Sequence, residues 1–293
     1  MRVAIATSEV VPELFDDDEL IVEALERLGV EAGFIPWDAE GVDWAGFELV
    51  VVRSTWDYTG RLEEFRDWAD GVGDRLRNPA AVLRWNSDKR YVADLAEAGI
   101  PAVPTAFVEP GDDVPALEGE VVVKPVISAG GRDTGRFRPP AHDEARALLA
   151  RLGEAGRTAM VQPYLGAVDE RGETALVFVA GEFSHALRKR AVLRPDEVAP
   201  VRDDALGAAE AMYDPDLVRA SDSTEAERGL GLRVIEHIAD RFGATPLFAR
   251  VDLVPGPDGE PVVMELEAIE PCLYLHESPP TAERLAKAIA AEL

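Results

Sequence analysis

The chain of 293 residues carries 56 acidic side chains against 30 lysines and arginines, which leaves a net charge of −26 at pH 7. Hydrophobic residues make up 47% and charged residues 29%, as in a globular protein large enough for more than one domain. So acidic a chain repels phosphate backbones and anionic lipids, which argues against nucleic acid and membranes as partners. The single cysteine, Cys272, cannot form an internal disulfide, and no apolar run suits a membrane span or signal core, so we expect a cytoplasmic protein.

The first 85 residues alternate strand-like and helix-like patterns. Apolar residues in the segment 18–28 recur at helical spacing, and Gly29 after them favours a helix end. Short apolar runs typical of strands occur at residues 2–6, 32–37 and 49–52. The alternation of strand and helix predicts a parallel α/β domain over residues 1–85.

The segment 86–165 predicts a mixed α+β lobe. Ser87 is the expected N-cap of a helix that continues to Ala98, where Gly99 and Pro101 favour its end. The other expected elements of this lobe are strands at 120–125 and 158–164 and a helix at 143–153.

The segment 166–293 predicts a second α+β lobe. Ala180-Gly181 separates two strand-like runs, 174–179 and 182–188, and indicates a hairpin. Residues 190–223 contain scattered proline, aspartate and arginine with weak periodicity, which favours a mobile segment or lid. The other expected elements are a helix at 224–242, strands at 248–254 and 262–268, and a helix at 281–292.

The last two strands predict a cluster of charged side chains. If Asp258-Gly259 forms a two-residue turn, or the centre of a four-residue loop, Asp252 lies opposite Glu265 and Arg250 lies opposite Glu267. Period-two alternation then places these four side chains on one face of the hairpin. The opposite face is expected to carry apolar residues, namely Val251, Leu253, Met264, Leu266 and Ala268.

Two interpretations of this charged face are equally open. One is a solvated face with a cross-strand ion pair, which is common in antiparallel hairpins. The other is a magnesium site, because hard cations prefer carboxylate oxygens and nucleotide enzymes use one or two carboxylates with phosphate oxygens.

A second candidate site follows the strand at 120–125. Lys124 ends an apolar run, and a loop of small residues follows: Ser128, Ala129, Gly130 and Gly131. Backbone amides in such a loop can approach phosphate oxygens closely, although a tight surface turn has the same composition. Neither a P-loop nor a dinucleotide-binding glycine pattern is present in the sequence.

Four further segments contain candidate residues with ordinary structural alternatives. Lys89 could contact an anion or lie on a solvated helix face, and Arg188 in the basic cluster 188–190 could attract an anion or balance nearby acids. The strand exit at Gln162, Tyr164 and Leu165 is compatible with a hinge beside an adenine ring. The loop after the third expected strand could form a substrate wall, through Ser54, Thr55, Trp56 and Asp57.

These motifs, in this order along the chain, resemble those of the ATP-grasp superfamily, which includes D-alanine–D-alanine ligase and glutathione synthetase. Within it, residues 53–58, 84–91, 128–135 and 168–176 are similar to the ligases that close the ring of cycloserine. The resemblance implies an α/β then α+β ATP-grasp fold. Its parts would be a pre-ATP-grasp domain at 1–85, a central lobe at 86–165 and a C-terminal lobe at 166–293, the two lobes clasping ATP.

The resemblance also implies roles for individual residues. Lys89 and Lys124 would hold the α- and β-phosphates, and the loop from Ser128 to Gly131 would close over the β- and γ-phosphates. Gln162, Tyr164 and Leu165 would line the adenine pocket, with Asp169 near the ribose hydroxyls.

Asp252, Glu265 and Glu267 would bind two Mg²⁺ ions, with Mn²⁺ as a substitute. Arg250, together with Arg188, would stabilise the transferring phosphoryl group. Many superfamily members have asparagine where this chain has Glu267.

The implied function is an ATP- and Mg²⁺-dependent ligase that activates a small-molecule carboxylate as an acyl phosphate. Ring closure within one molecule, of the type that turns O-ureidoserine into cycloserine, is the first expectation. An intermolecular ligase joining amino acids or dipeptides is one alternative, and a nucleotide-binding module without catalysis is another. A homodimer is an open possibility.

Overall fold

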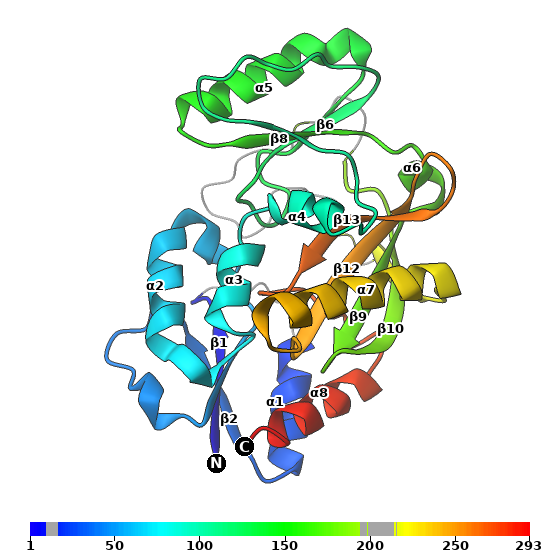
Figure 1. The fold of residues 1–293 in the computed structure, drawn as a ribbon. Coiled ribbons are helices and arrows are strands. Elements are labelled where there is room, and N and C mark those ends of the chain that lie inside the picture. The colour runs from blue at the N-terminus through cyan, green and yellow to red at the C-terminus, as the bar shows by residue number, and fades with distance from the viewer. Residues whose placement is uncertain (10–16, 194–197, 199–213, 215) are drawn as a thin grey trace.

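The computed structural model describes residues 1–9, 17–193, 198, 214 and 216–293. Its described elements build three β-sheets that lie within residues 2–77, 106–163 and 173–267 (Figure 1). The mixture of one parallel sheet with two antiparallel sheets confirms the predicted α/β then α+β fold class. None of the described helices is long and apolar enough to cross a membrane.

The N-terminal sheet is parallel, with strand order β2-β1-β3-β4. Its strands are β1 (Arg2–Thr7), β2 (Glu31–Pro36), β3 (Leu49–Val52) and β4 (Leu76–Arg77). Alternate residues of β1 and β3 face helix α1 (Asp17–Arg27) on one side and helix α2 (Leu62–Val72) on the other. Strands β1, β2 and β3 and helix α1 match their predictions, whereas β4, with only two residues, was missed. Helix α2, together with the short 3₁₀ helices η2 (Trp44–Gly46), η3 (Trp56–Gly60) and η4 (Gly73–Arg75), was not predicted.

The connection into the central lobe differs from its prediction. Ser87 does not start a helix: it closes helix α3 (Ala80–Asn86), and its backbone amide donates to Leu83. The next helix, α4 (Tyr91–Glu97), begins four residues later. Lys89 therefore lies in a helix-to-helix connection, where its amide donates to the carbonyl of Val126 at 2.8 Å. This bond ties the segment around Lys89 to the end of the lysine-bearing strand.

The central lobe is an antiparallel sheet of order β5-β8-β6-β7, drawn at the top of Figure 1. Its strands are β5 (Ala106–Val108), β6 (Val121–Pro125), β7 (Gly135–Phe137) and β8 (Ala159–Pro163). Helix α5 (His142–Glu154), preceded by η5 (Pro139–Ala141), packs leucines against valines of β6 and β8. Strands β6 and β8 and helix α5 match their predictions, whereas β5 and β7 were missed because each has only three residues.

The C-terminal lobe is an antiparallel sheet of order β11-β10-β9-β12-β13. Its elements are α6 (Ala167–Arg171), β9 (Glu173–Val179), β10 (Glu182–Lys189), β11 (Val218–Ser221), α7 (Glu225–Phe242), β12 (Phe248–Pro255), β13 (Pro261–Glu267) and α8 (Pro280–Ala290). The predicted β9–β10 hairpin is confirmed, with positive φ at Ala180 and Gly181. Thr224 forms a capping box with Glu227 at the start of α7. Strand β11 was missed, and residues 194–197, 199–213 and 215 of the predicted mobile segment lie outside the described residues.

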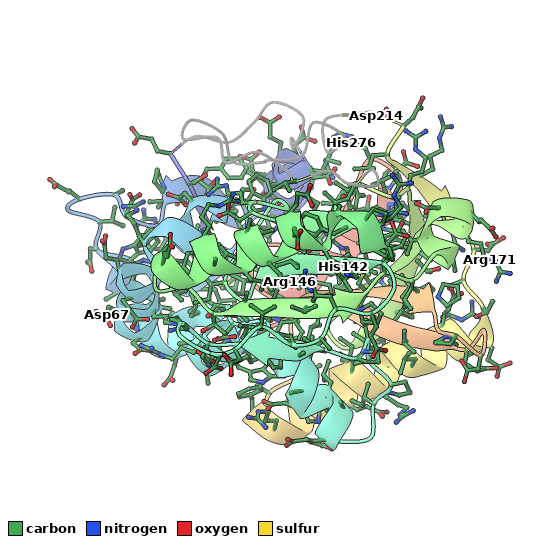
Figure 2. The ribbon with its side chains drawn as sticks, turned by 90° about the horizontal axis from the view of Figure 1, so that it is seen from above. Asp67, His142, Arg146, Arg171, Asp214 and His276 are labelled. Carbon is green, nitrogen blue, oxygen red and sulfur yellow. The ribbon has the colours of Figure 1, made fainter. Side chains whose placement is uncertain are left out.

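The C-terminal lobe packs on the N-terminal domain as well as on its own helices. Helix α7 covers one face of its sheet through Val234 and Ile238, while α8 shares an apolar cluster with α1 and the N-terminal sheet (Figure 1). The borders proposed at residues 85 and 165 stay predictions, since α4 joins the core beneath α7. Seen from above, Asp67 and Arg171 lie at opposite sides of the molecule and Arg146 lies on α5 (Figure 2), so the outer surface carries both signs of charge.

Candidate active site

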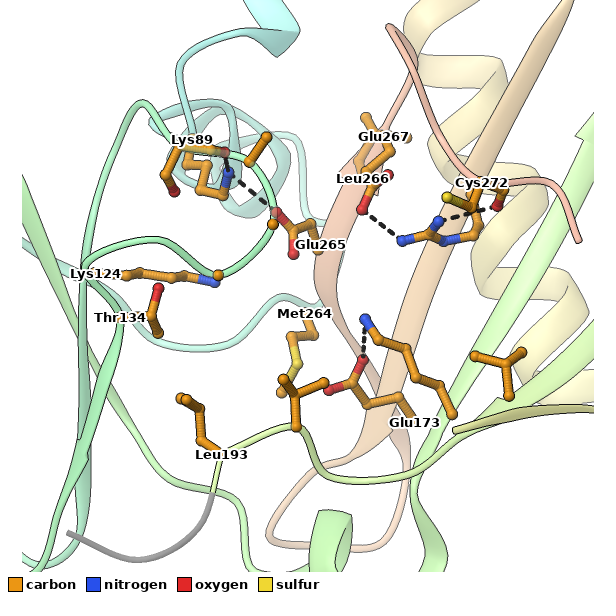
Figure 3. A pocket seen from close by; sticks show the side chains of 18 of the residues that line it. Lys89, Lys124, Thr134, Glu173, Leu193, Met264, Glu265, Leu266, Glu267 and Cys272 are labelled. Carbon is orange, nitrogen blue, oxygen red and sulfur yellow. Dashed lines mark hydrogen bonds and ion pairs between the residues drawn. The ribbon is translucent and has the colours of Figure 1, made fainter. Parts of the chain in front are cut away.

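A cavity of about 470 Å³ is lined by residues from the N-terminal domain and from both of the lobes that follow it. The N-terminal domain contributes Trp56 and Tyr58, and the helix connection contributes Lys89. Figure 3 shows Lys124 and Thr134 of the central lobe across the cavity from Glu267 and Cys272 of the C-terminal lobe. The following residues also line it: Ser128, Ala129, Gly130, Gly131, Gln162, Tyr164, Leu165, Glu173, Lys189, Arg250, Met264, Glu265 and Glu270.

The β12–β13 hairpin has the predicted register at the charged residues. Arg250 pairs with Glu267 and Asp252 pairs with Glu265. The loop itself differs from the prediction, because it spans residues 256–260 and closes with Gly256 N–H donating to the Glu260 carbonyl at 2.7 Å. Because this five-residue loop is centred on Asp258, a regular hairpin would pair Asp252 with Met264 instead of Glu265. A β-bulge beyond Asp252 restores the pairing with Glu265.

The bulge corrects the prediction for Met264. Leu253 pairs with Val263, and Asp252 pairs with Glu265, so Met264 is the extra residue of the bulge. Its side chain lines the cavity instead of joining the apolar face, while Val263 enters the core beneath α7. The carboxylates Glu265 and Glu267 therefore share the cavity with a thioether, whereas the buried Asp252 lies outside the lining and pairs with Glu265 across the hairpin.

Each candidate metal carboxylate contacts a cationic side chain. Lys89 Nζ lies 3.2 Å from Glu265 Oε1, and Arg250 Nε lies 2.8 Å from Asp252 Oδ1. Arg250 also donates to Glu267. Lys189 Nζ lies 3.7 Å from Asp252 Oδ2. The candidate metal carboxylates are thus paired with cationic side chains.

Burial and charge act against each other on the ionisation of these groups. Although burial alone would raise it, Lys89 and Lys124 hold the pKa of Glu265 below its ordinary range. For Glu267 burial dominates and raises the pKa, despite the charge of Arg250. Burial also lowers the pKa of Lys124. Added negative charge beside Lys124 would favour its protonated form, which suits a phosphate-binding position.

Side chains in and next to helices α3 and α4 complete the hydrogen bonds along the open edge of β13 and the residue that follows it. Leu266 N–H donates to Tyr91 Oη at 2.9 Å, and Asn86 Nδ2 donates to the Leu266 carbonyl at 2.9 Å. Ala268 N–H donates to Asn86 Oδ1 at 2.7 Å, and Asn78 Nδ2 donates to the Ala268 carbonyl at 2.8 Å. These contacts fix the backbone on which Glu265 and Glu267 stand.

The donor set suits a hard divalent cation. Asp252, Glu265 and Glu267 offer carboxylate oxygens, the ligands that Mg²⁺ prefers when phosphate oxygens supply the rest. Within the described ranges, no three His, Cys, Asp or Glu side chains already form a metal-binding group. In this arrangement the three carboxylates contact Lys89 and Arg250, so a cation would have to replace those contacts.

Comparisons with known proteins decide the family. Residues 3–78 match the model of the N-terminal domain of D-cycloserine synthetase DcsG. The chain is 36% identical over 304 residues to the cycloserine biosynthesis protein DcsG of Streptomyces lavendulae, covering 99% of this chain and 98% of that protein. The chain belongs to the DcsG family of ATP-grasp enzymes. It is an ATP-dependent ligase.

Solved structures agree with this assignment. The crystal structure of D-cycloserine synthetase DcsG superimposes with a TM-score of 0.88 at 33% identity, over 99% of both chains. D-alanine–D-alanine ligase from Bacillus anthracis shares the fold, with a TM-score of 0.69 at 16% identity over 100% of this chain and 97% of that one. The alternative of a nucleotide-binding module without catalysis is not retained.

Arg188 lies away from the cavity of the ligase, contrary to its predicted position. Its guanidinium donates to Thr174 Oγ1 at 2.6 Å, and Thr174 donates in turn to Glu227 of α7. Successive residues of a strand face opposite sides of a sheet, so Lys189 points into the cavity instead. Lys189 also contacts Glu173 at 3.3 Å. Sequence reasoning missed both residues of this pair as site residues, although the basic cluster at 188–190 was noticed.

The predicted adenine-side residues come together on one wall. Gln162, Tyr164 and Leu165 line the cavity, and Gln162 Nε2 donates to Thr105 Oγ1 at 2.9 Å. Asp169 does not line it. Its carboxylate accepts two hydrogen bonds from Arg136 and one from Tyr164 Oη, which together lower its pKa. A role for Asp169 at the ribose stays a prediction.

The loop at 54–57 only partly reaches the cavity. Trp56 lines it, whereas the buried Ser54 donates to Asp18 and the buried Thr55 lies outside the lining. Asp57 accepts hydrogen bonds from Trp37 and Arg61. Tyr58, one residue beyond the predicted set, completes this wall.

Proposed function

We propose that this ligase uses ATP to activate the carboxylate of a small amino-acid-like substrate and then closes a ring within the same molecule, as in cycloserine formation. One observation carries the proposal: full-length similarity to a cycloserine biosynthesis protein accompanies a cavity with lysines, an arginine and carboxylates in ATP-grasp order. In this proposal the γ-phosphoryl group passes to a carboxylate oxygen, giving ADP and an acyl phosphate. A nitrogen of the same molecule then attacks the carbonyl carbon and expels phosphate.

The residues of this chain contribute charge and position. Lys89 and Lys124 would hold the α- and β-phosphates, and amides of the 128–131 loop would approach the β- and γ-phosphates, since Gly130 and Gly131 have positive φ values of 63° and 70°. Gln162, Tyr164 and Leu165 would line the adenine side. Positioning and charge neutralisation account for most catalysis of phosphoryl transfer.

The carboxylates Asp252, Glu265 and Glu267 would hold the divalent cations that neutralise phosphate charge. We propose two Mg²⁺ ions, with Mn²⁺ as a substitute. Arg250, fixed by Asp252 and by the carbonyl of Cys272 at 3.0 Å, would stabilise the transferring phosphoryl group. The cytoplasmic location and the homodimer stay predictions for measurement.

ADP release in the presence of candidate substrates tests the proposal. Both enantiomers of O-ureidoserine, ordinary amino acids and dipeptides would be screened, with product mass spectrometry to separate ring closure from intermolecular ligation. Asp252→Asn and Glu265→Gln should abolish substrate-dependent ADP release. Glu236→Gln, which removes the same charge from an exposed position on α7, is the matched control. Near-normal turnover in either site variant contradicts the residue assignment, and no response to O-ureido-D-serine contradicts the cycloserine-type substrate.

A further inference from the structure

Glu270 is a buried carboxyl group that the proposed chemistry of ATP does not use. It lies three residues beyond Glu267, lines the cavity and is only 8% exposed. Four other carboxylates in or beside the cavity, at Glu173, Asp252, Glu265 and Glu267, each contact a lysine or arginine. Asp17, which also lines the cavity, lies 3.6 Å from His276. Glu270 forms no ion pair with any described residue, and Lys89, whose charge acts on it, contacts Glu265 instead.

The N-terminal domain holds Glu270 in place. The backbone carbonyl of Glu270 accepts a hydrogen bond from Trp56 Nε1 at 3.1 Å. Its side chain is hydrogen-bonded by Tyr58, which is buried and stacks on Phe65 with 4.8 Å between ring centroids. A carboxyl oriented in this way, and lined with aromatic side chains, has the form of a recognition group for a ligand.

A buried carboxylate without a counter-ion is costly, and a bound cation removes that cost. The ligand expected in this cavity supplies one. An α-amino acid derivative carries an ammonium group on the carbon next to the carboxylate that is to be activated. The proposed metal ions, lysines and Arg250 account for Glu173, Asp252, Glu265 and Glu267, and Asp17 has His276 as its neighbour. Asp214 and Glu277 are exposed, so Glu270 is the buried carboxyl of the described lining that is left for this ammonium group.

We propose that Glu270, oriented by Tyr58, binds the substrate ammonium group and thereby selects α-amino acid derivatives. This inference rests on the proposed function, since it needs an amino-acid-like substrate. In the free protein burial, and then the charge of Glu267, raise the pKa of Glu270 to about 8. An ammonium group beside it would lower that pKa, so binding near pH 7 would release a proton.

Calorimetric titration tests the ammonium site separately from catalysis. O-ureido-D-serine and its deamino analogue, in which hydrogen replaces the ammonium group, would be titrated in the presence of Mg²⁺ and a non-hydrolysable ATP analogue. The proteins would be the wild type, Glu270→Gln and the control Glu236→Gln, each checked for folding by circular dichroism. The wild type and the control should bind the amino compound roughly tenfold or more tightly than the deamino compound, the difference expected for a charge-assisted hydrogen bond.

Glu270→Gln should abolish this preference, because it should weaken the binding of the amino compound and leave the binding of the deamino compound unchanged. The binding enthalpy of the wild type should also depend on the ionisation enthalpy of the buffer, and that dependence should vanish in Glu270→Gln. Retention of the preference by Glu270→Gln, or absence of a preference in the wild type, overturns the proposal. A wild type that binds with the expected preference but releases no ADP would contradict the proposed function and leave the ammonium site standing.

Discussion

Replacing Glu270 with glutamine should stabilise the substrate-free protein at alkaline pH, even as it impairs substrate binding. The carboxyl has an ordinary pKa of 4.5 and a pKa of about 8 in the folded chain. Between these values the folded protein retains a proton that the unfolded chain has lost, so the stability of the wild type falls as pH rises. Below about pH 4.5 both states are protonated and the penalty is absent. Above about pH 8 both are ionised and the penalty is constant.

The size of the effect follows from the two pKa values. Their difference corresponds to about 5 kcal/mol at 1.36 kcal/mol per pKa unit, which is an upper bound for a rigid site. Local relaxation and water entry reduce such penalties, so we expect glutamine to raise the unfolding free energy by about 2 kcal/mol at pH 8.5. The groups that act on this carboxyl are the Tyr58 hydroxyl, Glu267 and Lys89. Glutamine keeps the size of the side chain and its ability to accept from Tyr58.

Urea unfolding of the wild type, Glu270→Gln and Glu236→Gln at several pH values from 5 to 8.5 checks this reasoning. The advantage of Glu270→Gln should grow with pH, whereas Glu236→Gln, at an exposed position, should follow the wild type throughout. Substrate added in excess should remove the advantage, because the ammonium group then compensates the charge of the wild type. An advantage that is the same at pH 5 and pH 8.5, or a loss of stability at pH 8.5, would refute the argument.

Three further predictions concern the rest of the cavity. Asn86→Ala leaves two buried backbone groups without partners, the Leu266 carbonyl of β13 and the Ala268 amide just beyond it. The unfolding free energy should therefore fall by about 3 kcal/mol in urea titrations, and ADP release should fall with it. Lys189→Met should reduce the rate of ADP release at least tenfold, while Arg188→Met, on the other face of the sheet, should change it less than about twofold. Chelation of divalent cations with EDTA should stop ADP release, and added Mg²⁺ should restore it.

Local patterns predicted the elements of the fold well where they were long or bounded by distinct turns. The β9–β10 hairpin was found because Ala180-Gly181 adopts the positive φ values that such a turn needs. The start of helix α4 was predicted wrongly because serine is a preferred N-cap residue. In the structure Ser87 instead caps the C-terminus of α3. Propensity alone does not distinguish these two uses of a serine.

The part of the candidate site that was predicted correctly is the part that depends only on which side chains share one face of the β12–β13 hairpin. The pairing of Asp252 with Glu265 was right, yet the predicted turn was not, because the structure adds a residue in the loop and a bulge at Met264 that compensates for it. To choose between Arg188 and Lys189, one must know which residues of β10 face the cavity. A second bulge, beyond Phe183, changes that alternation along the strand. Bulges depend on packing against neighbouring strands, so they leave no reliable mark on a single sequence.

Charge explains how an acidic chain can recruit an acidic ligand. Four cations, Lys89, Lys124, Lys189 and Arg250, act on four carboxylates in and beside the cavity, those of Glu173, Asp252, Glu265 and Glu267. These eight side chains together are near neutrality within a molecule of net charge −26. When ATP enters with divalent cations, phosphate can take the place of carboxylate beside the lysines, and the metal can take the place of lysine beside the carboxylates. The exchange conserves the local balance of charge. Glu270 stands outside that exchange, and a substrate ammonium group is the cation that would balance it.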